Sequence, residues 1–283
     1  MKHILPLSFL CLLTLGCSQN EDNIPEGIPN NEIHYISTDG EIVFPSNMNF
    51  GTGVSPIDNV YENNKGIITF DKDVTTIGDR AFEECKNLSE IILPNSITEI
   101  RQSAFSLSGL TSITIPKNVT RIDEFAFYCT ELTSFYGKYA SNDHRCLIVN
   151  GTLCAYARKG LTEYDIPEGV KEIGAGAFYS CALTQITLPE SVEKIGETAF
   201  YASPYLTSIT LPKNIRSINR LAFGNCRSIE AIYCKAVFPP TLGSGSFYGL
   251  SYSTTITYVP RESVDAYKAA SGWETHNIVG YDF

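Results

Sequence analysis

The sequence has few of the residue patterns that mark catalytic or metal-binding proteins. Only four histidines occur in 283 residues. Three of them follow the N-terminal segment (His34, His144 and His276), and none lies in a metal-binding or nucleophile motif. No two of the nine cysteines lie two to four residues apart, which excludes zinc-binding pairs of the CxxC type. We therefore expect no metal site, no cofactor and no catalytic residues.

Positive charge and long apolar runs are also scarce. The chain has 21 Lys and Arg against 31 Asp and Glu, so its net charge is −10. Nucleic acid is excluded as a partner because phosphate binding needs a basic stripe. Attraction to anionic membrane surfaces is disfavoured for the same reason. Beyond the N-terminus, no stretch reaches the ~18 apolar residues that a membrane-spanning helix requires.

Residues 1–16 have the pattern of an export signal. A basic start is followed by a short apolar run and by Gly16, directly before Cys17. The run is too short for a permanent membrane span. Residues 13–17, Leu-Thr-Leu-Gly-Cys, resemble the lipobox of bacterial lipoproteins, although Thr14 and Leu15 differ from its usual residues. That resemblance implies cleavage before Cys17 and lipid attachment to its sulfur; the alternative is an ordinary cleavage site beside an incidental cysteine.

Residues 17–32 predict a flexible tether. They are polar, contain Pro and Gly, and have no hydrophobic periodicity. Glu21 and Asp22 resemble the export tags of some Gram-negative lipoproteins. We therefore expect an exported protein that is lipid-anchored to the outer membrane at the cell surface and contacts the membrane through its anchor only.

An internal repeat dominates the rest of the chain. Ala-Phe pairs recur at steps of 22 or 23 residues, apart from one step of 51. Five units also carry an apolar-x-x-apolar-x-apolar-Pro segment, and a second alternating segment follows the proline, as in residues 119–122, 170–173 and 192–195. Such a fixed period predicts a solenoid. The pairs are Ala81-Phe82, Ala104-Phe105, Ala126-Phe127, Ala177-Phe178, Ala199-Phe200 and Ala222-Phe223, with a degenerate Ser246-Phe247 after them.

The repeat unit explains its own residue pattern. About twenty residues cannot bury an apolar face alone and do so only against neighbouring units. Alternation over residues 110–116 places Ile113 and Ile115 inward and Thr114 outward, and Pro116 ends the strand because it has no N–H. In the Ala-Phe pair, we expect Ala to allow close approach of the next coil and Phe to fill the interior.

Taken together, these motifs resemble the BspA-like leucine-rich-repeat family of bacterial surface proteins. The pattern Val-x-x-Ile-Gly-x-x-Ala-Phe followed by Cys is carried by residues 74–85 and again by 170–181. The resemblance spans roughly residues 66–260 and implies a non-catalytic extracellular fold whose members have been associated with adhesion. The fold class we expect is a β-rich (α+β), right-handed leucine-rich-repeat solenoid with 22–23-residue coils.

The chain divides into five predicted parts. After the signal (1–16) and tether (17–32) come an N-terminal β cap (33–65), the solenoid (66–250) and a C-terminal cap with a strand and a short helix (251–283). In the first cap, residues 35–44 predict a hairpin with an Asp39-Gly40 turn. In the second, Val264, Tyr267 and Trp273 are expected to cover the open core.

The 51-residue step predicts a β-hairpin insertion at about 137–160. Two apolar runs flank Asn150-Gly151, and a polar tip, residues 141–144, precedes them. The hairpin either widens the sheet or acts as a recognition element. Its two-residue turn pairs Leu147 with Cys154, which disfavours a bridge between Cys146 and Cys154.

The cysteines that follow the Ala-Phe pairs are predicted to be buried thiols. They occupy near-equivalent places in coils that do not adjoin, beyond disulfide reach. These residues are Cys85, Cys129, Cys181 and Cys226.

The outward positions of the first strands form the candidate binding face. They carry short polar residues, two aromatics and one aliphatic, and exposed aromatics are the side chains best able to anchor a protein or a sugar. The seven residues are Ile92, Thr114, Tyr136, Asp165, Thr187, Thr210 and Tyr233. On the second strands the outward positions alternate in charge, which indicates a solvated structural face. Those positions are Glu99, Arg121, Glu172 and Lys194.

Three functions remain open at this stage. The leading hypothesis is a cell-surface lipoprotein that binds an extracellular protein or glycan. The alternative is a glycan-capture or scaffold component of an outer-membrane nutrient-uptake system. The third is a hydrolase, for which nothing selects a carboxylate pair.

Overall fold

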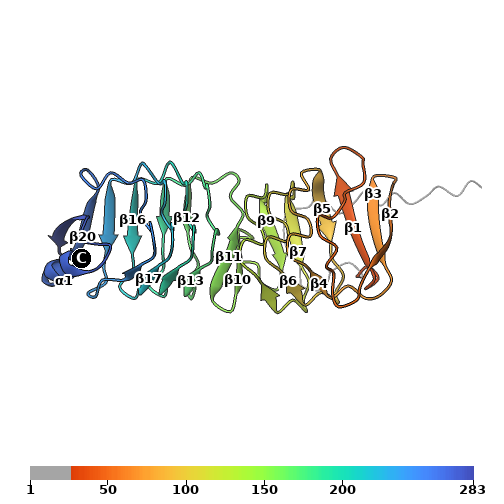
Figure 1. Ribbon diagram of the computed structural model, residues 1–283, viewed down its shortest axis with the longest axis horizontal. Helices are drawn as coiled ribbons and strands as arrows, with labels where there is room; N and C mark the ends of the chain where they lie inside the picture. Colours follow the sequence, from red (N-terminus) through yellow and green to blue (C-terminus); the bar gives the residue numbers. More distant parts are fainter. Residues whose placement is uncertain (1–26) are drawn as a thin grey trace, which may run out of the picture.

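The computed structural model describes residues 27–283 as an elongated stack of coils (Figure 1). About nine turns of roughly 22 residues form a β-solenoid with little helix, which confirms the predicted fold class. The predicted export signal, Cys17 and the first part of the tether lie outside the described residues.

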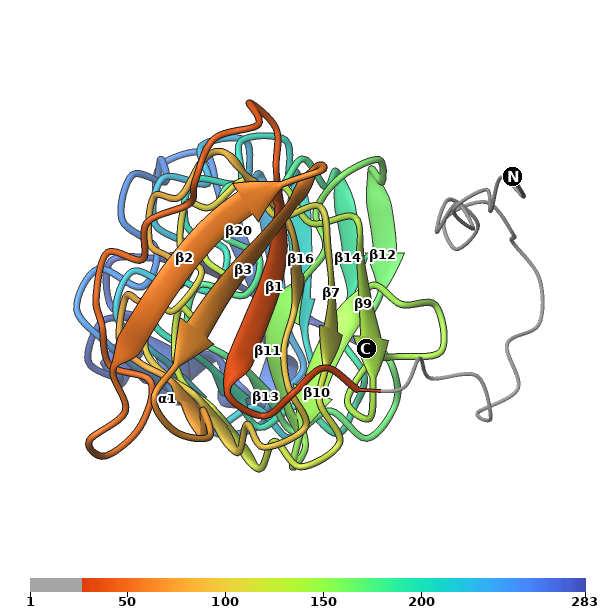
Figure 2. The ribbon, with the colours of Figure 1, turned by 90° about the vertical axis from the view of Figure 1, so that its right-hand side faces the viewer.

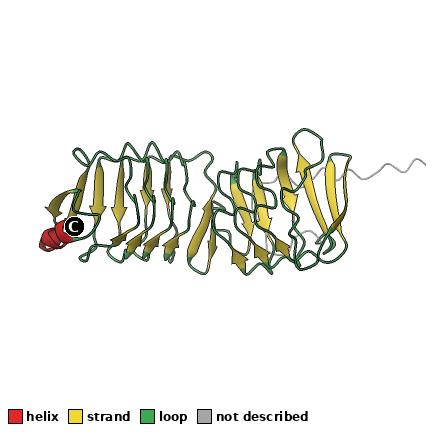
Figure 3. Cartoon of the chain, in the orientation of Figure 1, coloured by secondary structure: helices red, strands yellow, loops and turns green. Residues whose placement is uncertain are grey.

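Each coil contributes a first strand to one side of the stack (Figure 3). In β7, Ile113 and Ile115 are buried while Thr114 is exposed, as the alternation predicted. Wherever neighbouring first strands of the solenoid are hydrogen-bonded, they run parallel. The first strands are β5 (Leu88–Ile92), β7 (Ser112–Ile115), β9 (Ser134–Gly137), β12 (Glu163–Asp165), β14 (Gln185–Thr187), β16 (Ser208–Leu211), β18 (Ala231–Cys234) and β20 (Ile256–Pro260).

Second strands of two residues line another side of the stack. Each carries one inward aliphatic residue, and these residues align in parallel register, as Ile173 does with Ile195 and Ile195 with Ile218. The second strands are β4 (Thr76–Ile77), β6 (Glu99–Ile100), β8 (Arg121–Ile122), β13 (Glu172–Ile173), β15 (Lys194–Ile195), β17 (Ser217–Ile218) and β19 (Thr241–Leu242).

Tight turns that contain the Ala-Phe pairs complete each coil. The Phe200 N–H donates to the Ala222 carbonyl at 2.8 Å, and equivalent bonds join most neighbouring turns. Two residues before and two after Phe200, Thr198 and Ala202 have φ of 51° and 55°, and this left-handed conformation recurs in the other turns. The left-handed residues reverse the chain sharply, so a coil closes within about 22 residues.

The phenylalanines stack along the interior, as the packing interpretation predicted. Phe200 and Phe223 are fully buried, with ring centroids 5.0 Å apart and planes inclined by 2°. Similar stacks join Phe82 with Phe105, Phe105 with Phe127, Phe178 with Phe200, and Phe223 with Phe247. Ala199 and Ala222 are fully buried beside them, where a larger side chain would separate the coils.

The predicted hairpin insertion is present and belongs to the stack itself. β10 (Cys146–Val149) and β11 (Thr152–Tyr156) are antiparallel, and β11 pairs in parallel with β13. β11 therefore occupies the place of a second strand. Leu147 packs in the N-terminal core cluster, whereas Leu153 and Tyr156 pack in the C-terminal one, with Tyr156 stacked on Phe178 at 4.7 Å. The hairpin thus joins the two halves of the core.

The predicted pairing within the hairpin is wrong by one residue. Val149 does pair with Thr152, but Leu147 pairs with Ala155 rather than with Cys154. A register shift between Leu147 and Ile148 leaves Cys154 without a partner. Such a bulge changes the face on which side chains emerge. Here it turns Leu153 into the C-terminal core cluster and Ala155 into the N-terminal one.

The N-terminal end is covered by an antiparallel sheet that differs from the expected hairpin (Figure 2). β1 (Glu32–Ser37) lies between β3 (Lys65–Phe70) and β5, and β2 (Pro56–Glu62) flanks β3. Residues 41–44 form no strand, so the predicted 35–44 hairpin is wrong. Both edges of β1 are already paired. The backbone of Val43 instead bonds to the side chains of Tyr35 and Asn59.

The C-terminal end is covered as the sequence predicted. β20 is the strand of this cap, and a 3-10 turn (Arg261–Ser263) leads from it into the short helix α1 (Val264–Ala269). Tyr267 and Trp273 are fully buried against the last coil. A further strand, β21 (Asn277–Tyr281), pairs in parallel with β20 and was not predicted.

His276 makes the C-terminal cap sensitive to acid. It is 8% exposed, between the rings of Tyr252 and Trp273, and burial lowers its pKa to about 4, with Glu274 opposing this. The unfolded chain binds the proton below its ordinary pKa of 6.5. The contribution of His276 is therefore complete above that pH and is lost as the pH falls from 6.5 towards 4.

The titration of His276 predicts a pH dependence of stability that the variant His276→Gln should lose. Between pH 7 and pH 5, the unfolding free energy of the native chain should fall by about 2 kcal/mol more than that of His276→Gln. Urea unfolding at both pH values measures it. Parallel pH profiles for the two proteins would show that His276 does not titrate as described.

Candidate binding surface

The structure places all seven predicted residues on the outward side of the first strands, which we call the first-strand face. Ile92 is 56% exposed and Tyr136 41%, and Tyr233 is half-buried. Thr114 pairs directly with Tyr136, Asp165 with Thr187, and Thr210 with Tyr233. The seven residues therefore form one outward column, and its β-sheet backbone is fixed by the buried core beneath it.

The loop before the hairpin divides this column in two. The Phe135 N–H donates to the His144 carbonyl at 2.7 Å, so residue 144 takes the place of the next strand beside β9. The His144 ring lies 4.8 Å from the ring of Tyr136. The predicted polar tip, residues 141–144, thus becomes part of the first-strand face.

An acidic hollow of about 320 Å³ lies between this loop and β12 and β14. It is lined by Asp143, Glu163, Tyr164, Asp165 and Gln185. Partial burial alone would raise the pKa of Asp143, but hydrogen bonds from the Ser141 hydroxyl and the Arg145 N–H outweigh it and hold this pKa below its usual value. Asp143 is therefore an anion at neutral pH.

The acidic residues do not form a metal centre. Within residues 27–283, no group of three or more His, Cys, Asp or Glu side chains is arranged to hold a metal ion. The hollow therefore contributes negative charge and hydrogen-bond acceptors to the face.

An aromatic cluster ends the first-strand face at its C-terminal side. Tyr258 follows Tyr233 in the outward column, and their rings stack at 4.8 Å. Tyr281 meets both rings, at 5.4 and 5.8 Å, and is 43% exposed. The outward column predicted from the sequence ended at Tyr233. The alternation of residues 256–259 already indicated that Tyr258 points outward, whereas Tyr281 belongs to the strand that was not predicted.

The charged second-strand positions form ion pairs between coils at one place and within a coil at another. Glu172 and Lys194 are paired across adjacent coils at 2.7 Å, as their alternation suggested. Arg121 instead pairs with Asp123 of its own coil, at 2.6 Å, rather than with Glu99. Exposed ion pairs of this kind add little stability because water and salt screen them, so this side of the solenoid is a solvated structural face.

The cysteines are structural. All seven in the described residues are free, and Cys85, Cys181 and Cys226 are buried as predicted. Burial raises the pKa of Cys146 and of Cys226 to about 12, so both remain protonated thiols at neutral pH. Cys129 is half-buried rather than buried, because it lies at the insertion, where the regular stacking of turns is interrupted.

The chain belongs to the family of BspA type leucine rich repeat proteins. The family model matches in six copies over residues 58–142 and 153–267, leaving out part of the inserted hairpin. Leucine-rich-repeat proteins of this family are typically non-catalytic. A comparison with curated proteins gave no match.

Solved structures of bacterial leucine-rich proteins resemble the chain. A leucine rich cell surface protein from Faecalibacterium prausnitzii is 27% identical with a TM-score of 0.58, over 74% of this chain and 58% of that one. The pneumococcal vaccine antigen PcpA is 20% identical with a TM-score of 0.54, over 74% of this chain and 66% of its own, and shares the fold. The chain thus spans little more than half of the Faecalibacterium protein. Within residues 27–283, no helix is long and apolar enough to cross a membrane.

Proposed function

We propose that the protein is a non-catalytic cell-surface lipoprotein, tethered through Cys17, that binds an extracellular protein or glycan through its first-strand face. The observation that carries this proposal is the outward column with Tyr136 and Tyr281 exposed and with half-buried Tyr233 and Tyr258 in the same aromatic cluster as Tyr281. Rigid aromatic side chains give large contact area at low entropic cost, which is why they dominate binding energies. The cell-surface description of the Faecalibacterium relative supports the location.

A second candidate is glycan capture or scaffolding within an outer-membrane nutrient-uptake system. The acidic hollow beside Asp143 and Asp165 favours it, since carboxylates accept hydrogen bonds from sugar hydroxyls. A glycan array separates this candidate from adhesion to matrix proteins. The hydrolase alternative predicts turnover in a broad substrate screen.

The first-strand face is tested by removing its aromatic anchors. The double variant Tyr136→Ala and Tyr233→Ala should weaken the partner's binding by about 30-fold or more, because two hot-spot side chains together contribute over 2 kcal/mol. Surface plasmon resonance with the identified partner measures it. Tyr205 and Tyr248 are 59% and 61% exposed outside the first strands, so their alanine variants are matched controls. Unchanged binding in the double variant would remove the first-strand face from consideration.

The anchor is tested separately. Metabolic labelling with a palmitate analogue should mark the native protein and leave Cys17→Ala unlabelled, with the variant released from the membrane fraction. A single acyl chain gives only marginal membrane affinity, whereas the multiple chains of a lipoprotein hold it firmly. An unlabelled native protein would contradict the proposed lipid anchor and would leave the proposed binding face unaffected.

A further inference from the structure

The turn between β18 and β19 is one residue longer than the same turn in the preceding coil. β16 and β18 pair Leu211 with Cys234, and β17 and β19 pair Ser217 with Thr241. Leu211 and Ser217 are six positions apart, whereas Cys234 and Thr241 are seven apart. Because both flanking strands keep their register, the extra residue must bulge outward. Phe238, at the centre of this turn, is 83% exposed.

The C-terminal cap holds both ends of this loop. The buried Tyr267 hydroxyl donates to the Ala236 carbonyl at 2.7 Å, and the buried Trp273 indole N–H donates to the Pro240 carbonyl at 2.8 Å. The consecutive residues Pro239 and Pro240 also have fixed φ. Phe238 is therefore presented on a preorganised loop, and binding to it costs little conformational entropy.

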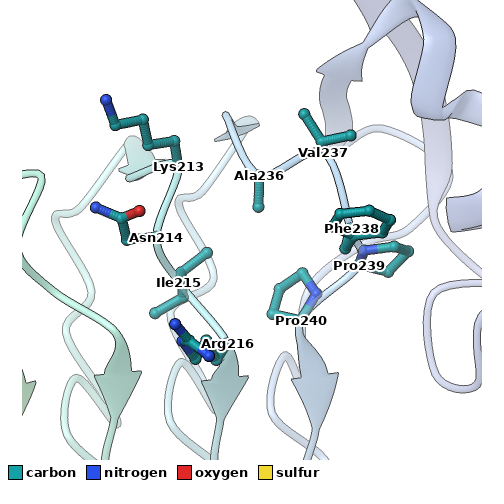
Figure 4. A pocket seen from close by; sticks show the side chains of 9 residues that line it. All are labelled: Lys213, Asn214, Ile215, Arg216, Ala236, Val237, Phe238, Pro239 and Pro240. Carbon is teal, nitrogen blue, oxygen red and sulfur yellow. The ribbon is translucent and has the colours of Figure 1, made fainter.

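A groove of about 620 Å³ separates this loop from the preceding turn (Figure 4). The loop forms an apolar wall in which Phe238 is the most exposed side chain. The facing turn supplies Lys213, Asn214 and Arg216, and the side-chain oxygen of Asn214 points towards the groove (Figure 4). The volume suits one or two small rings rather than a protein surface.

The charge of the groove is opposite to that of the protein. In a chain of net charge −10, its lining includes two cations and no carboxylate. Lys213 makes no ion pair within residues 27–283, because the adjacent Glu190 carboxylate accepts from the Lys213 backbone N–H and pairs with Lys235 at 2.9 Å. Arg216 pairs with Glu193 through Nε alone, at 3.3 Å, and its side chain is 80% exposed. Both cations are accessible to an anion.

We propose that this groove binds a sugar that carries an anionic group, such as a uronic or a sialic acid residue. The C–H face of the sugar ring packs on the electron-rich face of Phe238. Its carboxylate receives a charge-assisted hydrogen bond from Arg216, Lys213 adds a second positive charge at the other end of the same turn (Figure 4), and Asn214 accepts from a ring hydroxyl. This site lies outside the first-strand face and rests on the proposed role of the protein as a surface binding module.

Backbone chemistry disfavours an added peptide strand at this loop. Pro239 and Pro240 have no N–H, and the Ala236 and Pro240 carbonyls already accept bonds from the cap. A ladder of main-chain hydrogen bonds, on which strand addition depends, cannot form there. Recognition must come from side chains, as it does for a sugar.

Isothermal titration of the full chain in detergent tests the proposal with two matched pairs of probes. These are trigalacturonate against neutral galactotriose, and sialyllactose against lactose. At least one acidic probe should bind about tenfold more tightly than its neutral counterpart. Phe238→Ala should weaken that binding by about tenfold, and the double variant Lys213→Gln and Arg216→Gln should abolish the preference for the acidic probe.

Two variants outside the groove serve as controls. Tyr205→Ala and Arg227→Gln replace an exposed ring and an exposed cation outside the groove and should bind like the native chain. Absence of binding to both acidic probes, equal binding of the neutral probes, or native-like binding by the groove variants would each overturn the proposal. So would binding of acidic peptides in place of the sugars. The proposed function survives these failures if the Tyr136 and Tyr233 variant still loses its partner.

Discussion

Phe200→Ala is expected to lower the free energy of unfolding by about 3–5 kcal/mol, the usual cost of removing a buried phenyl ring. Phe200 is fully buried, with its ring between Phe178 at 5.1 Å and Phe223 at 5.0 Å. Its removal leaves a cavity and breaks both stacking contacts. Each coil is stabilised only by its neighbours, so the loss falls on two interfaces at once. Urea unfolding followed by circular dichroism measures the change.

An exposed ring provides the control for this prediction. Tyr205 lies five residues further along the same coil and is 59% exposed. Its replacement by Ala should change stability by no more than about 0.5 kcal/mol. If Phe200→Ala cost as little as Tyr205→Ala, the stacked phenylalanines could not be the main support of the coils.

Trp273→Ala is expected to have a comparable effect, concentrated at the C-terminal end. Trp273 is fully buried, packs against Phe247 and Tyr267 at ring distances of 5.8 and 5.2 Å, and donates to the Pro240 carbonyl. Losing this side chain should cost about 3–5 kcal/mol. Because it covers the last coil, amide protection should fall first in β20 and β21, with little change in β5 and β7. Hydrogen exchange resolved by mass spectrometry shows the distribution.

The conservative variant separates packing from hydrogen bonding. Trp273→Phe keeps a buried ring and loses the bond to Pro240, so it should cost clearly less than Trp273→Ala. Uniform loss of protection along the whole stack would contradict the role of Trp273 as a local cover.

The repeated coils were predictable because each unit has the same surroundings. Ile113, Ile195 and Phe200 are buried for reasons that recur every 22 or 23 residues, so one pattern predicts all copies. Periodicity also predicted the outward column that contains Thr114 and Tyr136. A single such unit would have given a much weaker signal, since short alternating segments are ambiguous.

The ends and the insertion were harder to predict because their partners are distant in sequence. The expected 35–44 hairpin is locally plausible, but β1 pairs with β3 and β5 instead, burying Tyr35 and Phe70. The bulge beside Leu147 depends on two core clusters that the hairpin joins, and no local rule indicates it. β21 lies outside the repeat, so nothing in the period predicted it.

The candidate sites were also predictable where they follow the repeat and unpredictable where they depend on the path of a loop. The column from Ile92 to Tyr233 followed from alternation, whereas its interruption by His144 required the actual path of the loop. The groove beside Phe238 depends on one additional residue between two strands in register. That signal was present in the sequence as the longer spacing before β19, but its consequence became visible only with the cap that holds the loop.

The most direct test of a surface module that binds through its first-strand face is site-specific photo-crosslinking on living cells. A photoreactive amino acid at Thr187, at the centre of the face, is compared with one at Lys171, an exposed residue beside the second strands. We predict a discrete crosslinked species at Thr187 that excess unlabelled protein competes away, and none at Lys171. Equal crosslinking at both positions, or a species at Lys171 alone, would contradict it.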